Sequence, residues 1–343
     1  MLETAKVTMF IEQTYATKVV TVQPLALGDK QVYRAQCRSG QDWVLRVYPP
    51  TGSDSLPVNL QGLVSVLEFL AQATYPAERV VRTASDSPIA LWDERPVLVT
   101  TFSGRALTAW QPAAHSGGPP PIAHPSELAY APEILFALSK AVGQLHCLQP
   151  DVTLPRAGML PSRELNWAAT LLAEIEPVVP PPLARQYAHL VTAVQTADRY
   201  EDLPFTLIHN DCNPSNVVIT PTGQIALIDW ESAGRGPALI DIGILLSNCF
   251  SKAQLAIKRE AVAAIVEGYC QVQRLSEAEL ERLPDAIRFF RLVLLAGYFP
   301  DLVQQKISAD DLLYGATYAQ WQAQYNASDE IAALACTYFR RYL

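Results

Sequence analysis

Residues with the potential for chemistry are concentrated in one stretch of the chain. Residues 207–243 read LIHNDCNPSNVVITPTGQIALIDWESAGRGPALIDIG. Asp211 and Asn216 lie in one loop, and Asp229 follows a predicted β-hairpin whose turn is Pro221 to Gly223. The hairpin returns Asp229 close to Asn216, so a carboxylate and an amide oxygen meet. Two such ligands leave open positions that suit Mg²⁺, which keeps waters and binds phosphates. Asp211 then remains as a possible base.

The segments HNDCNPSN and LIDWE resemble the catalytic loop and metal-binding motif of the aminoglycoside phosphotransferase and choline kinase superfamily, small-molecule relatives of protein kinases. Asp211 and Asn216 have the spacing of the kinase H-R-D-x-x-x-x-N loop. The resemblance implies that Asp211 orients the acceptor hydroxyl and takes its proton. It also implies that Asn216 and Asp229 hold Mg²⁺. Asn210 stands where the family more often has Gly.

Supporting roles follow from the same resemblance. His209 is expected to brace the loop from beneath, and Asp241 to anchor it through backbone N–H groups. His146, at the end of a predicted helix, is interpreted as packing. Cys212 lies beside Asp211 and is an alternative nucleophile. A cysteine without a matched histidine and an orienting group is usually inert, so covalent catalysis is disfavoured.

The strand DWVLRVY carries the candidate contacts to the nucleotide. Its alternation puts Val44 and Arg46 on one face, opposite Trp43, Leu45 and Val47. The pattern resembles the kinase strand that places a small apolar residue against adenine and a cation against the phosphates. Arg46 can grip phosphate bidentately. The partner acid of Arg46 stays open, because Glu68, the single acid of the following predicted helix, has polar neighbours typical of a solvated face.

Three further features complete the predicted ATP site. Gly28 lies in a short loop that resembles the covering loop of kinases, although an ordinary hairpin turn fits equally well. The run PVLVTTFSGRAL resembles the hinge, in which Thr100 to Phe102 would offer backbone groups to adenine. Val218 and Ile228 would form the opposite apolar wall.

The elements that must position these residues change along the chain. Strands are predicted over 18–24, 31–37, 42–48 and 96–102, with one helix over 60–73. Later residues have helical periodicity. Helices are predicted over 134–148, 161–175, 184–197, 252–272, 278–295 and 310–342. Residues 109–132, rich in Pro and Gly, predict an exposed loop. We therefore expect a bilobal, protein-kinase-like α+β fold, with an antiparallel nucleotide-binding lobe at 1–102 and a mainly helical lobe at 103–343.

Composition excludes several classes of protein. The 343 residues are 50% hydrophobic and 17% charged, which is typical of a folded protein. The formal net charge of -8 argues against nucleic acid and anionic membrane as partners. No segment approaches about 20 consecutive apolar residues. The six cysteines form no CxxC pair and are interpreted as reduced thiols, as in a cytoplasmic protein.

The predicted reaction is transfer of the γ-phosphoryl group of ATP to a hydroxyl of a small molecule, with Mg²⁺ as cofactor. Aminoglycosides, amino alcohols such as choline, homoserine and sugars all remain open as acceptors. Glu231 and Asp301 would suit an amine-bearing acceptor, or could be solvated surface. The alternative is a nucleotide-binding regulatory module without turnover, which the single glycine of the covering loop favours. The sequence leaves the oligomeric state open.

Overall fold

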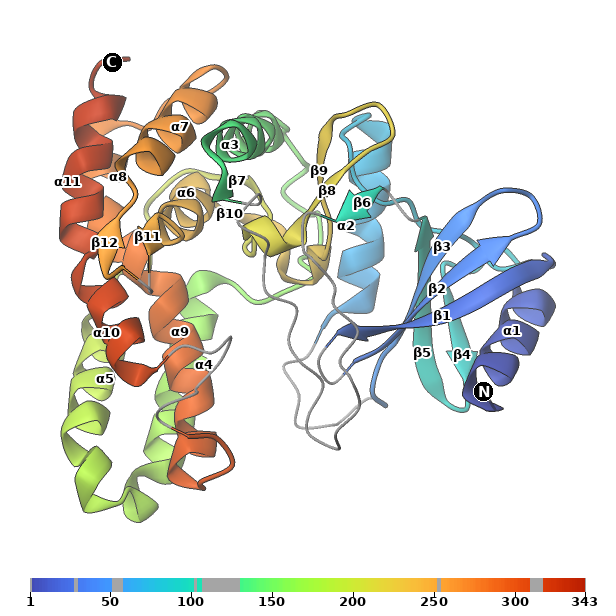
Figure 1. Ribbon diagram of the computed structural model, residues 1–343, viewed down its shortest axis with the longest axis horizontal. Helices are drawn as coiled ribbons and strands as arrows, with labels where there is room; N and C mark the ends of the chain where they lie inside the picture. Colours follow the sequence, from blue (N-terminus) through green and yellow to red (C-terminus); the bar gives the residue numbers. More distant parts are fainter. Residues whose placement is uncertain are drawn as a thin grey trace.

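The computed structural model describes residues 2–27, 30–50, 58–101, 104–106, 130–251, 254–308 and 317–342. These residues form two parts that lie side by side (Figure 1), an antiparallel sheet with two helices and a larger, mainly helical part. The predicted bilobal α+β architecture is confirmed. Gly28, Phe102, residues 109–129 and the predicted lobe boundary at 102/103 lie outside the described residues.

Five strands form the antiparallel sheet in the order β1, β2, β3, β5, β4. They are β1 (Val19–Leu27), β2 (Lys30–Cys37), β3 (Asp42–Val47), β4 (Ile89–Trp92) and β5 (Arg95–Thr101). The sequence analysis predicted four of them and missed β4.

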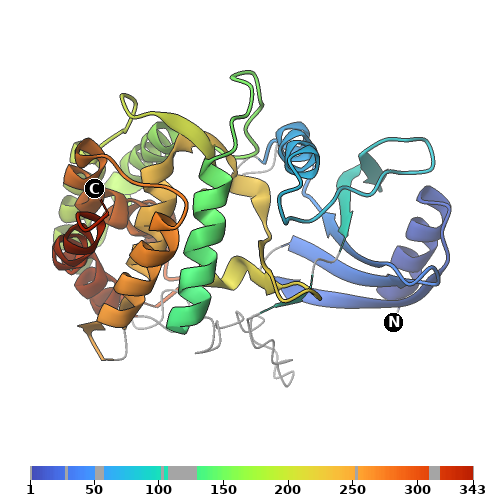
Figure 2. The ribbon, with the colours of Figure 1, turned by 90° about the horizontal axis from the view of Figure 1, so that it is seen from above.

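Helix α1 (Leu2–Thr14), also not predicted, covers one face of the sheet (Figures 1 and 2). On that face Trp43, Leu45 and Val47 of β3 are buried in one cluster with Val7 and Ile11 of α1. The predicted alternation of β3 is therefore confirmed. Val44 and Arg46 point to the opposite face of the strand.

Helix α2 (Leu60–Gln72) joins the two parts. It begins at Asn59, whose side chain accepts a hydrogen bond from the backbone N–H of Gly62 at 3.1 Å, a typical N-cap. Leu63 and Leu67 are buried in the same apolar cluster as the core of the helical part. At Gly62 a Cβ atom would come within 2.0 Å of the carbonyl oxygen of Arg156, so only glycine allows this approach.

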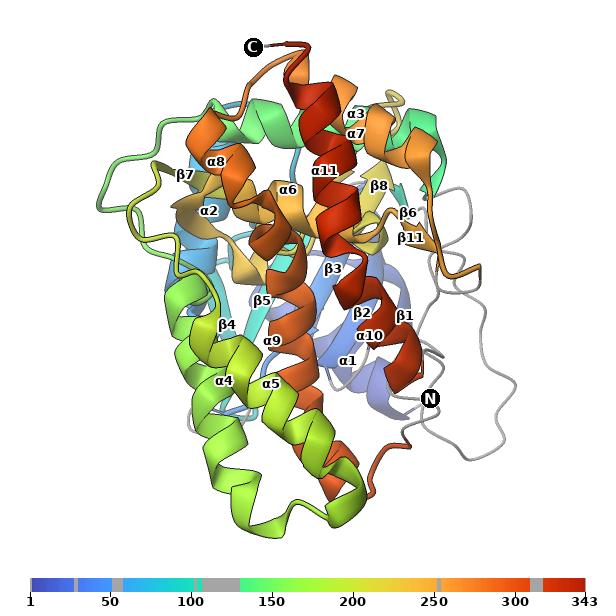
Figure 3. The same cartoon turned by 90° about the vertical axis from the view of Figure 1, so that its left-hand side faces the viewer.

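The helical part is built around a buried central helix, α6, which packs against α9. Figure 3 shows α4 and α5 as a pair beside α9. The helices are α3 (Pro132–His146), α4 (Pro161–Ile175), α5 (Ala184–Thr196), α6 (Ala238–Ser247), α7 (Arg259–Cys270), α8 (Glu277–Glu281), α9 (Leu283–Val303), α10 (Tyr318–Asn326) and α11 (Ser328–Phe339). Among the described helices, none is long and apolar enough to cross a membrane.

Short strands flank the loop that contains Asp211. Strand β7 pairs with β10, and β8 pairs with both β6 and β9. A further small hairpin, β11 with β12, precedes α7. The bounds are β6 (Arg105–Ala106), β7 (Phe205–Ile208), β8 (Val217–Ile219), β9 (Ile225–Leu227), β10 (Gly234–Pro237), β11 (Phe250–Ser251) and β12 (Ala256–Ile257).

Three predicted helices need correction. The helix predicted from residue 252 begins at Arg259, because β12 (Ala256–Ile257) occupies part of that stretch. The helix predicted over 278–295 is two helices: a capping box at Ser276 starts α8, and α9 starts anew with Pro284 in its first turn, where proline is tolerated. The region predicted as 310–342 contains α10 and α11, which meet at Ala327.

Candidate active site

The hairpin of β8 and β9 brings the predicted metal ligands together. Asn216 ends a short 3₁₀ turn before β8, and the chain reverses at Gly223, which has φ +81°. After β9 the backbone N–H of Ile228 donates to the carbonyl oxygen of Asn216 at 3.0 Å. Asp229 therefore lies beside Asn216, as predicted. The hairpin lies between the sheet and the helical part (Figure 2).

Asp211 is held by two asparagine side chains from its own loop. Asn216 Nδ2 donates to Asp211 Oδ2 at 2.8 Å and to its carbonyl oxygen at 2.9 Å. Asn213 Nδ2 donates to Asp211 Oδ1. Both oxygens of this carboxylate thus accept N–H groups, which fixes its orientation. The sequence analysis gave no role to Asn213, which lies within the motif.

The oxygens next to Asp211 fit a hard cation. Because Asn216 uses its Nδ2 for Asp211, its Oδ1 is the end left for another partner. Within the described part of the chain, the Asp229 carboxylate accepts no hydrogen bond and forms no ion pair. Asp229 has left-handed backbone, φ +65° and ψ 60°, a conformation that costs non-glycine residues about 1 kcal/mol or more. Carboxylate and amide oxygens are the donors that Mg²⁺ prefers, so these two residues fit the predicted ion.

No group of three or more His, Cys, Asp or Glu side chains suited to a metal occurs among the described residues. An ion held by Asn216 and Asp229 would take its remaining ligands from water and phosphate.

The catalytic loop is anchored from α6. Asp241 is fully buried and accepts the backbone N–H groups of His209 and Asn210, each at 2.8 Å, and His146 Nε2 at 3.1 Å. Burial alone would raise the pKa of Asp241, but the hydrogen bond and charge of His146 and the N–H of His209 lower it below its ordinary value. Asp241 therefore serves as an ionised structural anchor. His146 packs against that anchor, in agreement with its predicted role.

His209 lies under the loop, as predicted. Its Nε2 is 3.0 Å from the carbonyl oxygen of Ile228, and its ring meets Trp230 edge to face at 4.5 Å. Burial lowers the pKa of His209, so the imidazole is neutral and Nε2 carries the proton donated to Ile228. The residue connects the loop of Asp211 with the strand before Asp229.

The backbone at Asn210 shows why asparagine can replace glycine at this position. Its backbone has φ +60°, a left-handed conformation that asparagine tolerates better than most residues. Its side chain Nδ2 donates to Glu164 Oε1 of α4 at 2.8 Å. Burial raises the pKa of Glu164 to about 7. Glu164 is a contact that the sequence analysis missed.

Cys212 does not have the properties of a nucleophile. Its side chain is fully buried and its Sγ lies 3.2 Å from the carbonyl oxygen of Asp241. Burial raises the pKa of the Cys212 thiol well above its ordinary value. The six cysteines are free thiols, as predicted.

Arg46 has a carboxylate partner that the sequence analysis did not find. Its Nη1 and Nη2 donate to the two carboxylate oxygens of Glu78 at 2.9 and 3.3 Å. Thr100 Oγ1 accepts from Arg46 Nη1 at 3.0 Å and donates to Glu78 at 2.5 Å. Burial alone would lower the pKa of Arg46, but Glu78 raises it, so the guanidinium is charged. Glu68 instead forms a surface ion pair with Arg82, as its polar neighbours indicated.

The predicted hinge contact of Thr100 needs correction. The N–H of Val81 donates to the carbonyl oxygen of Val99, and the N–H of Thr101 donates to that of Arg79. Backbone groups alternate along a strand, so those of Thr100 face Val44 in β3. Thr100 contributes its hydroxyl to Arg46 and Glu78, and its backbone is occupied by the sheet.

The other predicted nucleotide contacts lie where strands pair. Val44 is half-buried opposite Thr100, Val218 is buried in β8, and Ile228 is half-buried beside Asp229. Their role toward adenine stays a prediction.

The two acids considered for an amine-bearing acceptor have partners within the protein. Tyr48 donates its hydroxyl to Glu231 Oε1 at 2.8 Å, and both residues are buried. Asp301 forms an ion pair with Lys306 at 3.3 Å near the end of α9. Glu231 therefore links the sheet to the catalytic hairpin.

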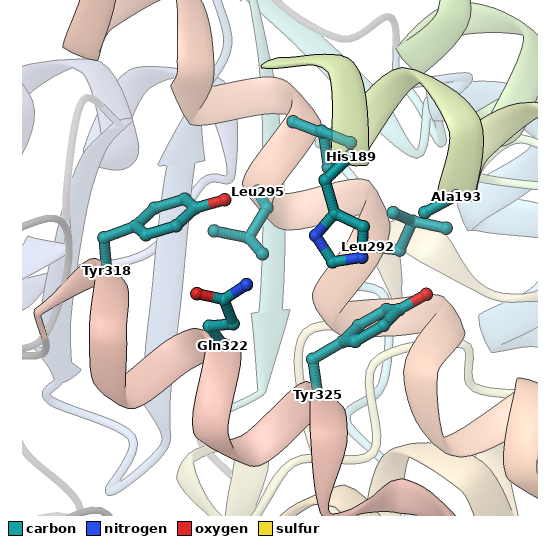
Figure 4. Close-up of a pocket in the computed structure, with 8 residues that line it drawn as sticks. His189, Ala193, Leu292, Leu295, Tyr318, Gln322 and Tyr325 are labelled. Carbon is teal, nitrogen blue, oxygen red and sulfur yellow. The ribbon is translucent and has the colours of Figure 1, made fainter. Parts of the chain in front are cut away.

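A small pocket in the helical part is too narrow for an acceptor. Figure 4 shows it between α5, α9 and α10, where His189, Tyr318, Gln322 and Tyr325 are among the residues that line it. Its volume of about 20 Å³ has room for about one water molecule. None of the predicted site residues lines it.

Comparison with known proteins identifies the family of the chain. Residues 21–289 match the model of a family described as a phosphotransferase enzyme family. A hydroxylysine kinase from Danio rerio is 21% identical over 334 residues, which are 91% of this chain and 88% of that protein. A homoserine kinase from Agrobacterium fabrum is 38% identical over 96 residues, 26% of this chain and 30% of that enzyme.

A solved structure gives the fold independently. An amicoumacin kinase in complex with AMP-PNP and Ca²⁺ superposes with a TM-score of 0.65 and 17% identity, over 95% of this chain and 93% of that one. This likeness confirms the predicted kinase-like fold.

Proposed function

The chain belongs to the phosphotransferase enzyme family and is a small-molecule kinase that acts on hydroxyl groups. We propose that it transfers the γ-phosphoryl group of ATP, with Mg²⁺ as cofactor. One observation carries the proposal: Asn213 and Asn216 hold both oxygens of Asp211, and the hairpin places Asp229 beside Asn216. This arrangement supplies a base and two cation ligands within one short segment.

Asp211 is the residue that meets the acceptor. Its carboxylate orients the hydroxyl group and accepts the proton as the oxygen attacks phosphorus. Asn216 and Asp229 would hold Mg²⁺, which neutralises charge on the phosphate oxygens when bound. Asp241 and His209 keep the loop in place and do not exchange protons with substrate.

Arg46 supports the proposal from the sheet. A guanidinium has five N–H donors, so Arg46 can keep Glu78 as partner and still donate to phosphate oxygens. Phosphoryl transfer depends mainly on such positioning and charge neutralisation, and it needs no covalent nucleophile. The buried, protonated Cys212 agrees with that mechanism.

Hydroxyl-bearing amino acids and amino alcohols are the acceptors we propose to test first. The relatives act on hydroxylysine and homoserine by their names, and both are small molecules with an alcohol and an amine. Aminoglycosides and sugars form the second group of a screen. Phosphorylated product and ADP should appear together for the right acceptor, and only with ATP and Mg²⁺ present.

Asp211→Asn is the control variant for this screen. A protein that binds Mg-ATP but turns over no acceptor in either group would instead be a nucleotide-binding regulatory module. Equal turnover by the wild type and Asp211→Asn would contradict the role of Asp211 as base.

A further inference from the structure

A buried arginine on α9 is connected to the Asp211 carboxylate through two asparagines. We propose that Arg291, Asn248 and Asn213 form a hydrogen-bond relay that orients Asp211 for proton transfer. Arg291 and Asn248 are then positioning residues, which act through Asn213 and touch neither substrate nor nucleotide. The inference deepens the proposed function and rests on it, because that function makes Asp211 the base.

The relay has three links. Arg291 Nη2 donates to Asn248 Oδ1 at 3.3 Å. Asn248 Nδ2 donates to Asn213 Oδ1 at 3.0 Å, and Asn213 Nδ2 donates to Asp211 Oδ1. The links join α9, the residue that follows α6, and the catalytic loop. Elements distant in sequence therefore converge on one carboxylate oxygen.

The relay has a direction, and the arginine sets it. The two ends of an amide have nearly the same shape, so the partners decide which end faces where. A guanidinium can only donate, so Asn248 presents Oδ1 to Arg291 and its Nδ2 to Asn213. The carbonyl oxygen of Ile244 accepts from the same Nδ2 at 2.8 Å and favours the same orientation. Asn213 must then turn its own N–H toward Asp211.

Burial restricts the movement of the Arg291 and Asn248 side chains. Arg291 is 7% exposed and Asn248 is 9% exposed. The guanidinium lies over the rings of Phe290 and Trp321, with its carbon 5.5 and 5.2 Å from their centroids. Hydrogen bonds in such a poorly solvated chain strengthen and polarise one another, and the positive end lies farthest from Asp211.

Two independent donors leave the carboxylate with one orientation. Asn213 holds Oδ1 at the end of the relay, and Asn216 holds Oδ2 from the metal side. Loss of the Asn213 donor would allow Asp211 to rotate about its remaining contacts. A misplaced catalytic group lowers kcat more than it lowers substrate affinity.

Four variants test the relay. Arg291→Met removes the hydrogen-bond donor to Asn248 and keeps an unbranched side chain beside the Phe290 and Trp321 rings. Arg291→Lys keeps a charged group that can donate hydrogen bonds but cannot accept them. Asn248→Asp keeps an acceptor for Arg291 but removes the donor to Asn213. Arg288→Met, three residues earlier on α9 and in contact with Asp285 and Asp329, is the matched control.

Kinetics with the identified acceptor give the first readout. We expect kcat to fall roughly 10- to 100-fold in Arg291→Met and Asn248→Asp, with Mg-ATP affinity unchanged. Arg291→Lys should retain most of the wild-type kcat, and Arg288→Met all of it. The double variant Arg291→Met, Asn213→Ala should lose no more than Asn213→Ala alone, because the relay is already cut. Wild-type kcat in Asn248→Asp, or independent losses in the double variant, would overturn the proposal.

Side-chain amide signals give a second readout that needs no turnover. In protein labelled with [¹⁵N]asparagine, the Asn213 and Asn248 signals are assigned by their loss in alanine variants. Arg291→Met should shift both signals, and Arg288→Met neither. An unchanged chemical shift of the Asn213 side-chain amide in Arg291→Met would refute the relay. If no acceptor is found, the proposed function fails, while these signals still decide whether the relay exists.

Discussion

The β8–β9 hairpin with its preceding loop, and the five-stranded sheet, assemble their side chains in different ways. In the hairpin, Asp211, Asn216 and Asp229 come from one stretch of 19 residues, Asp211 to Asp229, and the turn between two short strands brings them together. In the sheet, Arg46 meets Glu78 and Thr100, which lie 32 and 54 residues away. The sequence spacing of residues is enough to indicate a site formed within one segment. A contact between residues far apart in the chain, such as Arg46 with Glu78, depends on how the sheet and the loop after α2 fold.

This difference decides what each region tolerates. The hairpin residues are held by hydrogen bonds to neighbours in the chain, so single changes there should alter chemistry and leave the fold intact. Arg46 and Glu78 are buried together, so a change there removes a compensated charge from the core. The predictions below test this contrast, beginning with the largest effect.

Asp211→Asn should give the largest loss of activity and little loss of stability. The amide is isosteric, but it cannot accept the proton of the acceptor hydroxyl. General-base contributions are typically 10²- to 10⁴-fold, so kcat should fall by about that factor while Mg-ATP affinity and Tm stay near wild type. Steady-state kinetics with calorimetric ATP titration measures both. A similar fall in Tm would show that the hairpin is as structural as the sheet.

Glu78→Ala should give the opposite pattern. Breaking a buried ion pair by removing one partner costs about 3–5 kcal/mol, since the Arg46 charge is left buried alone. The control is Glu68→Ala, which removes a partly exposed ion pair with Arg82 and should cost less than about 1 kcal/mol. Urea unfolding compares the two. Equal losses in both variants would contradict the assignment of Glu78 as the partner of Arg46.

The same contrast explains what could be predicted from the sequence. Motif spacing pointed to Asp211, Asn216 and Asp229, which the structure holds within one segment, and alternation placed Arg46 on its face. The partner of Arg46 was missed because Glu78 lies in the loop between α2 and β4, where no periodicity marks a buried residue. Thr100 was assigned to the hinge because the sequence does not show that residues 79–81 pair alongside β5.

The elements show a similar limit. Helix α4 agrees with its prediction at both ends, because apolar periodicity and Pro161 mark it clearly. Helix α1 was not predicted, although Val7, Phe10 and Ile11 have helical spacing and are buried in one cluster with the sheet. Strand β4 has four residues, which is too short for alternation to show. Relay residues such as Asn248 carry no local signal at all.

Asp229→Ala tests the metal half of the hairpin and should have a smaller effect than Asp211→Asn. Removal of one carboxylate ligand should weaken Mg-ATP at least about tenfold, or 1.4 kcal/mol, since the ion links protein and phosphates. Chelation of Mg²⁺ should weaken ATP in the wild type and have little further effect in the variant. Titration of ATP with and without EDTA measures this. Unchanged affinity in both cases would remove Asp229 from the metal site.

Glu164→Gln tests the contact between the loop of Asp211 and α4, through the pH dependence of stability. Burial raises the pKa of Glu164 from an ordinary 4.5 to about 7, and Asn210 Nδ2 donates to its Oε1. Below pH 4.5 the carboxyl is protonated in both folded and unfolded chains. Between pH 4.5 and 7 the unfolded chain ionises first, so this group makes wild-type stability fall as pH rises, until about pH 7.

Glutamine keeps the acceptor for Asn210 and does not titrate. The free energy of unfolding of Glu164→Gln, relative to wild type, should therefore increase by roughly 1–2 kcal/mol between pH 5 and pH 8. The whole pKa shift, at about 1.4 kcal/mol per pKa unit, would correspond to a larger change in the free energy of unfolding. We expect less because water screens the half-buried carboxylate. Urea unfolding at both pH values measures the change. Glu174→Gln, on the exposed side of α4, is the control, because it shows how much stability changes when any carboxylate is removed from that helix. A difference between Glu164→Gln and wild type that is constant with pH would show that Glu164 titrates alike in both states. The catalytic segment would then depend on α4 for packing alone.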